Sequence, residues 1–499
     1  MSQKILTAAG YHRATSYRRH GLTPHSLDWA HQPVPVKRYP QPDRVPLDHD
    51  RKLPPLDYPG IMRHASPGHP AAPDIQVMAT VFRLAHDVTA RAMHGGQPFH
   101  YRSVASAGAL YPFELYLAAH HIDGLAPGLY HYNLFDFSLT ALRRGPVPAI
   151  PPVNRGIAAT FYITGIFFRS AWKYRSRAYR YVLLDAGHLL ENLRLALGAL
   201  GMDFSIHLDF DDRRAATLLG LDPRREACLV GVHLHGAPAA EMGTGAAGDP
   251  KPLAGDILRA SVVSDREVAY PDILRIHRAG HAVETGSAGA PPELAVMKKT
   301  PASWIGLDPP EFPVPADYAR ILGQRRSRRN FLSASVSRAD LMSFLDLVTG
   351  HMGAASAMPP SCRSALATGF LAGSGMPVSP GFYLLDPDAR RLGCVSGGGF
   401  TESMARACLD QMWLKHAGLH LLFMTDLDAL DRTWGPRGYR YAMIEAGRLG
   451  QQVYLAATAM GWGACGIGAI YDREAADLLD LSDDGALLYL VGAGPVKRR

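Results

Sequence analysis

A run of basic and hydroxyl side chains stands in the second half of the chain, where Arg325, Arg326, Ser327, Arg328 and Arg329 follow one another. Guanidinium groups hold a phosphate dianion through charge-assisted hydrogen bonds, and a hydroxyl near a helix N-terminus adds a donor where the helix dipole favours an anion. The run therefore predicts a phosphate site formed by Arg325, Ser327 and Arg329. A solvated basic turn is the alternative that these residues alone leave open.

Two segments of small residues could lie against a flat ligand. The first comprises Ser106, Ala107 and Gly108, and the second is Gly-Ile-Gly at positions 466–468. Glycine has no Cβ, so its backbone can approach a ring more closely than that of any other residue. A tight turn would explain either segment on its own, so their meaning depends on what accompanies them.

The elements that position these residues occur twice. The segment 177–182 (RAYRYV) corresponds to 437–442 (RGYRYA), and 185–189 (DAGHL) corresponds to 445–449 (EAGRL), each pair being 260 positions apart. We expect the repeated arginines to orient helices and an interface between the copies, because both copies keep them.

Each copy continues with the same order of elements. Apolar residues at helical spacing, such as Leu189, Leu193 and Leu197, predict a long buried helix that ends near a glycine. A short strand, an acidic turn, a small helix and a last strand follow. Each copy is therefore an α+β unit.

The length and the loose segments suggest how the chain is divided. A chain of 499 residues is too long for one ordinary core. Residues 1–55, rich in Pro, His and Arg, are expected to form an arm, followed by a first domain at 56–240, a linker at 241–311 and a second domain at 312–499.

Several of these stretches resemble one known family. The segments 106–116 (SAGALYPFELY) and 124–132 (GLAPGLYHY) look like the signature of SagB-type dehydrogenases, the azoline-oxidising branch of the nitroreductase superfamily. The segments 27–33 and 173–181 extend the likeness over nearly the whole first half, and Arg325–Phe331 resembles the flavin-phosphate motif R-R-S-x-R of the superfamily. The resemblance implies two tandem nitroreductase-like α+β domains that form an intramolecular pseudo-dimer.

The distribution of motifs implies one flavin mononucleotide (FMN) per chain. Family members are usually homodimers in which each FMN contacts both subunits, yet here each half lacks what the other holds. In the second half, 360–365 replaces Ser-Ala-Gly; the first half has no R-R-S-x-R between Ala71 and Arg91, and has 205–207 (SIH) in place of the glycines. We expect the second site to be empty. The residues expected to bind the single FMN are Arg325, Arg326, Ser327, Arg329, Ser106, Ala107, Gly108, Gly466, Ile467, Gly468, Lys497 and Arg498.

Lys173 and Tyr174 match the Lys-Tyr pair that azoline dehydrogenases are thought to use in catalysis. A desaturation releases one proton and passes one hydride to flavin N5, so a base beside the ring assists the reaction. A surface lysine beside a core aromatic is the alternative. The second copy has Thr433 and Trp434 at the equivalent positions.

The resemblance leaves three functions open. The first is FMN-dependent oxidation of a small heterocycle or a peptide-borne azoline. The second is a nitro- or quinone-reductase with NAD(P)H as electron donor. The third is a non-catalytic flavoprotein or scaffold subunit of a modifying complex.

The composition argues against several other classes. No apolar run approaches the roughly 20 residues that cross a bilayer, and the N-terminus is a poor signal peptide, so we expect a cytoplasmic protein without a membrane partner. The net charge of +7 comes from dispersed residues, which argues against nucleic acid. The five cysteines form no C-x-x-C pair and the histidines show no metal-binding spacing, so no metal is predicted. Association into a further homodimer stays open.

Overall fold

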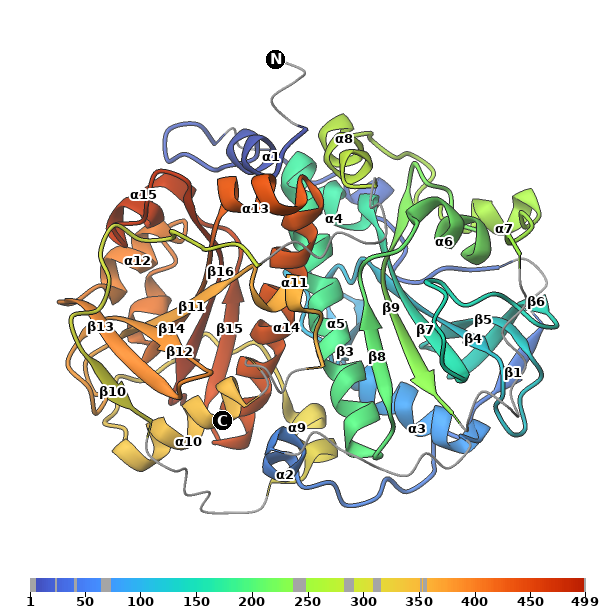
Figure 1. Ribbon diagram of the computed structural model, residues 1–499, viewed down its shortest axis with the longest axis horizontal. Coiled ribbons are helices and arrows are strands. Elements are labelled where there is room, and N and C mark those ends of the chain that lie inside the picture. Colours follow the sequence, from blue (N-terminus) through green and yellow to red (C-terminus); the bar gives the residue numbers. More distant parts are fainter. Residues whose placement is uncertain are drawn as a thin grey trace.

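The computed structural model describes residues 6–22, 25–39, 43–63, 73–236, 248–281, 291–307, 316–350, 352 and 357–497. Within these ranges the chain forms two seven-stranded sheets, one in each half, with helices packed around them (Figure 1). The two-copy α+β architecture predicted from the repeat is confirmed. The expected boundaries at 240/241 and 311/312 lie outside the described residues.

The sheet of the first half has the strand order β1-β6-β5-β4-β7-β9-β8, and every neighbouring pair is antiparallel. A separate hairpin of β2 and β3 stands beside it. The strands are β1 (Arg44–Pro46), β2 (Val88–His94), β3 (Gln97–Arg102), β4 (Phe113–Ala119), β5 (Gly128–Asn133), β6 (Ser138–Arg144), β7 (Ile157–Ile166), β8 (Phe204–His207) and β9 (Glu226–His235).

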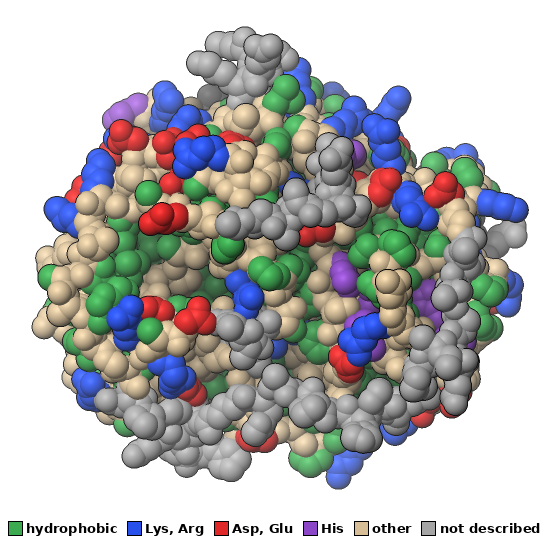
Figure 2. All heavy atoms as spheres, viewed as in Figure 1, with side chains coloured by type: hydrophobic (Ala, Val, Ile, Leu, Met, Phe, Trp, Pro, Cys, Tyr) green, Lys and Arg blue, Asp and Glu red, His purple; other side chains and the backbone are tan. Residues whose placement is uncertain are grey.

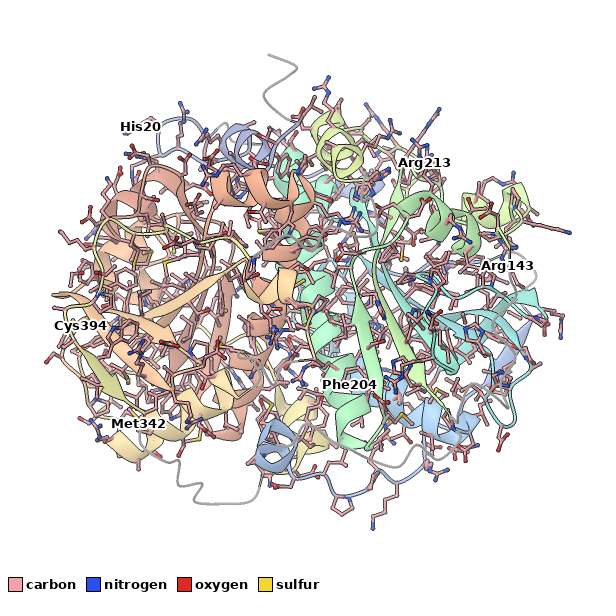
Figure 3. The ribbon with its side chains drawn as sticks, viewed as in Figure 1. His20, Arg143, Phe204, Arg213, Met342 and Cys394 are labelled. Carbon is pink, nitrogen blue, oxygen red and sulfur yellow. The ribbon has the colours of Figure 1, made fainter. Side chains whose placement is uncertain are left out.

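The sheet of the second half repeats this topology as β10-β13-β12-β11-β14-β16-β15, again antiparallel throughout. In Figure 3, Phe204 marks the start of β8 in one half and Cys394 lies on β13 in the other. The strands are β10 (Trp304–Gly306), β11 (Ala367–Ala372), β12 (Gly381–Asp386), β13 (Arg391–Gly397), β14 (Leu419–Asp426), β15 (Gly463–Ile467) and β16 (Gly485–Gly494).

Helices follow the same duplication, and the two longest of them, α5 and α14, are the buried helices that the sequence predicts. In the first half and linker the helices are α1 (Ala8–Ala14), α2 (Tyr58–Arg63), α3 (Ile75–Ala85), α4 (Phe167–Tyr174), α5 (Ala178–Ala199), α6 (Asp212–Leu219), α7 (Gly255–Arg259) and α8 (Pro271–Ala279), with 3-10 turns η2 (Trp29–His31), η3 (Ala107–Ala109) and η4 (Arg175–Arg177). In the second half they are α9 (Tyr318–Gln324), α10 (Arg338–Thr349), α11 (Pro360–Arg363), α12 (Thr401–Ala407), α13 (Leu427–Trp434), α14 (Arg437–Ala459) and α15 (Asp472–Leu478), with the 3-10 turn η5 (Met412–His416).

The long helices α5 and α14 pack against each other at the centre of the molecule, between the two sheets (Figure 1). Their backbones meet at the equivalent glycines Gly187 and Gly447. A Cβ added to Gly187 would lie 2.1 Å from the carbonyl oxygen of Ile444, and one added to Gly447 would lie 2.0 Å from that of Leu184. The crossing therefore requires glycine on both helices.

Reciprocal ion pairs fix the ends of this crossing. Arg177 and Arg180 of the first half bind Asp472 of the second, with closest N–O distances of 2.7 and 2.6 Å. In the reverse direction, Arg437 and Arg440 bind Asp212, and the Arg440–Asp212 distance is 2.7 Å. Burial alone would raise the pKa of each carboxyl, but the guanidinium groups hold both pKa values well below the usual range. The repeated arginines thus join the two halves.

The N-terminal arm and the linker contribute equivalent helices to this interface. His12 on α1 lies 3.1 Å from the Tyr439 hydroxyl, and His277 on α8 lies 3.1 Å from the hydroxyl of Tyr179, which is equivalent to Tyr439. After α1, the arm crosses to the first half, where the buried Lys37 ammonium binds Glu226 at 2.7 Å. The arm therefore contacts both halves.

Basic and acidic side chains are interspersed on the surface. On the face shown in Figure 2, basic and acidic side chains alternate without a large field of one sign. Among the described helices, none has the length and apolar character needed to span a bilayer.

We expect Gly187→Ala to destabilise the protein by at least about 1–3 kcal/mol, because the added methyl overlaps the backbone of α14 and overpacking forces the helices apart. The free energy of unfolding in urea measures this. The matched control is Gly198→Ala on the same helix, where nothing lies within 4 Å of the added Cβ. That change should be neutral or stabilising by about 0.5–1 kcal/mol. Equal effects of the two substitutions would contradict the close crossing.

Candidate functional site

A pocket that is partly open to solvent lies where the two halves meet. Both halves line it. The first half contributes Ala105, Ser106, Ala107, Gly108, Tyr181, Leu184, Asp185 and His188, and the second contributes Ser327, Arg329, Tyr454, Cys465, Gly466, Gly468 and Tyr489. The structure therefore brings the three predicted motifs, Ser-Ala-Gly, the arginine–serine run and the Gly-x-Gly segment, to one place.

The Ser-Ala-Gly segment forms the turn η3, and a buried carboxylate holds it in place. Ser106 Oγ donates to Asp185 at 2.5 Å, and the Ala107 amide donates to the same carboxylate at 3.1 Å. Gly108 has φ 63°, a left-handed conformation that glycine adopts without strain. A Cβ at this position would lie 2.8 Å from the Tyr174 hydroxyl and 3.2 Å from Lys173 Nζ. The turn is thus pressed against the predicted catalytic pair.

Lys173 and Tyr174 end helix α4 beside this turn. Burial, and next the charge of Arg329, lower the pKa of the half-buried Lys173. The Tyr174 ring packs on Tyr181 with centroids 4.2 Å apart, and burial raises the Tyr174 pKa well above its usual value. The surroundings therefore make the lysine easier to deprotonate and the tyrosine harder to deprotonate.

The side chains of the arginine–serine run differ in their surroundings. Arg325 donates to the carbonyls of Arg102 and Ser103 at 2.8 Å, while its buried Nη1 has no hydrogen-bond partner in the described part of the chain. Ser327 and Arg329 line the pocket directly. Arg326 instead binds the hydroxyl and carbonyl of Thr89 on β2.

The glycines of the Gly-x-Gly segment make room for tyrosines. A Cβ on Gly466 would overlap the Tyr489 hydroxyl, and one on Gly468 would lie 2.5 Å from the Tyr181 ring. The Gly466 amide donates to the Tyr454 hydroxyl at 2.7 Å, and that hydroxyl is also hydrogen-bonded to Ser327 Oγ at 3.0 Å. The glycines thus allow aromatic rings to wall the pocket.

Three other residues expected at the site lie elsewhere or outside the description. Ile467 points into the core of the second half, where it is 4% exposed. Lys497 is exposed, and its backbone amide donates to the Asn330 carbonyl at 3.1 Å. Arg498 lies outside the described residues.

The pocket also contains polar residues that were not predicted from the sequence, among them Asp185, His188, Tyr454 and Tyr489. His188 lies between Gln451 and Tyr489 at 2.9 and 3.0 Å, and burial lowers its pKa to about 4, so the ring is neutral near pH 7. The signal was present in the repeat: Asp185 and His188 of one copy stand where the other has Glu445 and Arg448. Asp185 and Glu445 are both carboxylates, but Arg448 corresponds to His188 and Arg194 corresponds to Tyr454, and these differences in charge mark where two otherwise similar helices diverge.

The equivalent place on the other side of the pseudo-dimer is filled by buried ion pairs. Shifting Asp185, His188, Gln451 and Tyr454 by 260 positions gives Glu445, Arg448, Glu191 and Arg194. Arg448 binds Glu445 at 2.6 Å and Glu191 at 3.2 Å, and Arg194 binds Glu191 at 2.7 Å. All four side chains are at most 5% exposed. This network occupies the position that the pocket has on the first side.

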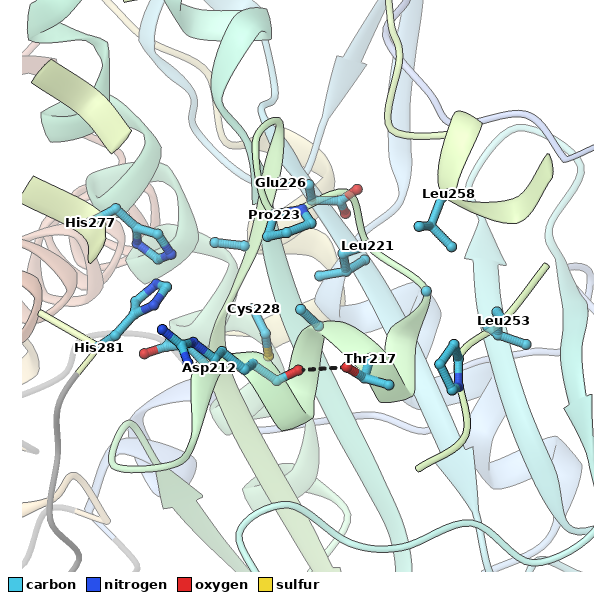
Figure 4. Close-up of a pocket in the computed structure, with 15 residues that line it drawn as sticks. Asp212, Thr217, Leu221, Pro223, Glu226, Cys228, Leu253, Leu258, His277 and His281 are labelled. Carbon is cyan, nitrogen blue, oxygen red and sulfur yellow. Dashed lines mark hydrogen bonds between the residues drawn. The ribbon is translucent and has the colours of Figure 1, made fainter. Parts of the chain in front are cut away.

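One group of side chains has the spacing of metal ligands. Ligand atoms of Asp212, His277 and His281 lie within 4.8 Å of one another, at the edge of a second pocket that also holds Cys228 (Figure 4). The Asp212 carboxylate already binds the two arginines of α14. A cation there would face two fixed guanidinium charges, so these residues favour ion pairing over metal binding.

The donors at the interface pocket fit FMN. Arg329 and Ser327 line the pocket with a guanidinium and a hydroxyl that are suited to a phosphate, and Arg325 has a buried Nη1 without a partner among the described residues. The small residues 106–108 and the aromatic walls suit a planar ring.

Comparisons with known proteins agree with this arrangement. The model of the nitroreductase family matches residues 75–236 and 322–495, one stretch in each half. The chain therefore belongs to the nitroreductase family, as two fused copies of its fold.

Individual relatives match smaller parts. A protein of Methanocaldococcus jannaschii named as a nitroreductase is 32% identical over 115 residues, 23% of this chain and 58% of that protein. The trifolitoxin-processing protein TfxB of Rhizobium leguminosarum bv. trifolii is 31% identical over 146 residues, 27% of this chain and 39% of TfxB. The chain thus spans 58% or less of the length of these relatives.

A crystal structure of a nitroreductase from Anabaena variabilis matches nearly the whole molecule. It covers 98% of this chain and 100% of its own, with a TM-score of 0.77 and 24% sequence identity. This likeness supports the two-copy fold.

We expect Arg448→Met to cost about 3–5 kcal/mol of unfolding free energy, because it leaves Glu445 and Glu191 without their shared buried cation. Urea denaturation followed by circular dichroism measures the loss. The control Arg432→Met removes an exposed ion pair with Asp428 and should cost less than about 1 kcal/mol. A loss at Arg448 no larger than that at Arg432 would show that the network does not stabilise the closed side.

Proposed function

We propose that this nitroreductase-family chain is an FMN-dependent dehydrogenase of the SagB type, with one FMN per chain, that oxidises an azoline or a similar small heterocycle. The observation that carries the proposal is the contact of Lys173 and Tyr174 with the Gly108 turn, at a pocket to which the other half contributes Ser327 and Arg329. Bound FMN would supply a hydride acceptor at its N5 atom.

The side chains of the protein would bind the cofactor and transfer the substrate proton. Arg325, Ser327 and Arg329 would hold the phosphate, and the 106–108 turn would lie against the ring. Lys173 is suited to remove the substrate proton, because its lowered pKa increases the neutral fraction. Tyr174 keeps its proton and can donate a hydrogen bond to a substrate heteroatom or to the lysine.

The relatives support two substrate classes. The likeness to TfxB, whose name describes processing of trifolitoxin, favours a substrate carried on a peptide. The likeness to a protein named as a nitroreductase favours the second candidate, reduction of nitro or quinone compounds with NAD(P)H. Bleaching of bound flavin separates them: a thiazoline-containing peptide bleaches a dehydrogenase under anaerobic conditions, whereas NAD(P)H bleaches a reductase.

We expect flavin extracted from purified protein to amount to one FMN per chain, because the buried ion pairs of Glu191, Arg194, Glu445 and Arg448 fill the equivalent second place. A ratio near two would contradict the single composite site. A colourless protein that binds no added FMN would favour the scaffold function.

Replacing both Arg325 and Arg329 by alanine should weaken FMN binding by roughly a hundredfold or more, because charge-assisted hydrogen bonds contribute about 1.5–3 kcal/mol each. Quenching of FMN fluorescence on titration gives the dissociation constant. The matched control is Arg326→Ala, since that side chain faces Thr89. An unchanged affinity in the double variant would place the phosphate elsewhere.

We expect Lys173→Ala and Tyr174→Phe to retain bound FMN but to slow flavin bleaching by the thiazoline peptide at least tenfold, as for loss of a proton-transfer group. In the unmodified enzyme the rate should rise with pH through a pKa below the usual lysine value, because the neutral amine is the active form. Thr433→Ala, at the position equivalent to Lys173, is the control. Loss of FMN in a folded Lys173 or Tyr174 variant would instead assign that residue to cofactor binding.

A further inference from the structure

Asp185 is a buried carboxylate in the wall of the pocket without a cationic partner at hydrogen-bond distance among the described residues. It is 2% exposed, and the hydrogen bonds it accepts come from Ser106 Oγ and the Ala107 amide. Other buried carboxylates at the interface are paired with cations: Asp212 and Asp472, for example, each bind two guanidinium groups. An unpaired buried carboxylate is costly, and such groups concentrate at functional sites.

The hydrogen bonds around Asp185 have a defined direction. The Tyr111 amide donates to Ser106 Oγ at 2.8 Å, so the Ser106 hydroxyl proton is free to point to Asp185. Both groups that face the carboxylate are therefore donors. An ionised carboxylate accepts from both. A protonated carboxyl brings an O–H that the Ala107 amide cannot accept and that Ser106 Oγ can accept only if its own hydroxyl proton turns away from Asp185.

The turn that Asp185 holds is conformationally costly. Gly108 has φ 63°, and the non-glycine residues Ala109 and Tyr111 have φ 54° and 45°, in the left-handed region that side chains disfavour. Strain of this kind persists only where surrounding contacts impose it. On its far side the turn touches Tyr174 and Lys173 through Gly108, so a change in the turn reaches both residues.

We propose that Asp185 is a positioning residue whose ionised form holds the 106–108 turn in its flavin-binding shape, so that cofactor affinity depends on the protonation of this one carboxyl. The inference rests on the proposed flavin site. Burial raises the Asp185 pKa to about 7, although the hydrogen bonds from Ser106 and Ala107 oppose the rise. The switch therefore lies near neutral pH.

The other titratable groups around Asp185 either change charge away from neutral pH or are the same in the unmodified chain and in the Asp185 variant. On α5, burial lowers the pKa of His188 to about 4; on α4, β16 and β15, burial raises the pKa of Tyr174, Tyr489 and Cys465. Burial similarly raises the pKa of Tyr454 on α14. Tyr181 on α5 and the permanently charged Arg329 also line the pocket. Lys173, whose pKa is lowered, lies next to Gly108 on the far side of the turn. The phosphate of FMN titrates near pH 6, equally in every variant.

The test is the FMN dissociation constant between pH 6 and 8, measured by fluorescence quenching for the unmodified chain and for Asp185→Asn. If only the ionised form binds, the competent fraction falls about tenfold from pH 8 to pH 6, and the dissociation constant rises by the same factor beyond the phosphate effect. Asp185→Asn should bind FMN more weakly at pH 8 and should lack this additional pH dependence. The exposed carboxyl variant Asp428→Asn should follow the unmodified chain.

A second variant carries the test if Asp185→Asn does not fold. Ser106→Ala removes a hydrogen bond that lowers the Asp185 pKa, so the midpoint of the pH dependence should move to higher pH. An unmoved midpoint, or an Asp185→Asn protein with the affinity and pH profile of the unmodified chain, would overturn the inference while leaving the proposed function standing. Failure of the unmodified chain to bind FMN at any pH would overturn both.

Discussion

The structure depends on the crossing of α5 and α14, where two glycines bring the helix backbones into direct contact. A side chain at Gly187 or Gly447 would separate the helices, and the arginines at their N-terminal ends would then no longer reach the aspartates of the opposite half. The pocket walls come from these same helices: Asp185 and His188 lie on α5, and Tyr454 lies on α14. The position of the candidate site is therefore set by how closely two helices approach.

Around this symmetric crossing the chemistry is asymmetric. Structural contacts are kept in both copies, as the reciprocal Arg–Asp pairs and the His12 and His277 contacts show. The pocket is present on one side only, and at the equivalent place on the other side two arginines and two glutamates form buried ion pairs. The structural contacts can be the same on both sides because an arginine–aspartate pair stabilises the interface whether or not a ligand is bound nearby.

Much of the fold could be predicted from the sequence, because the 260-residue repeat and its helical apolar spacing are local signals. The meeting of Ser106–Gly108 with Ser327, Arg329, Gly466 and Gly468 was predicted from the family resemblance and agrees with the pocket. The direction of individual side chains was not accessible: Arg326 and Arg329 are alike in sequence, yet only backbone geometry turns one toward Thr89 and the other into the pocket. Asp185 and His188 were hidden within a helix whose residues all read as buried, since periodicity does not distinguish a core from a pocket wall.

The charged network on the closed side has a consequence for how such a chain can change. In a homodimer of identical subunits, any substitution appears at both interface sites, so a residue that fills one cavity fills the other as well. Joining the copies in one polypeptide lets Arg194, Glu191, Arg448 and Glu445 arise on one side while His188 and Tyr454 remain on the other. In a fused chain, each half can therefore acquire substitutions that the other half does not have. One of the two equivalent cavities can then be filled by side chains while the other stays open.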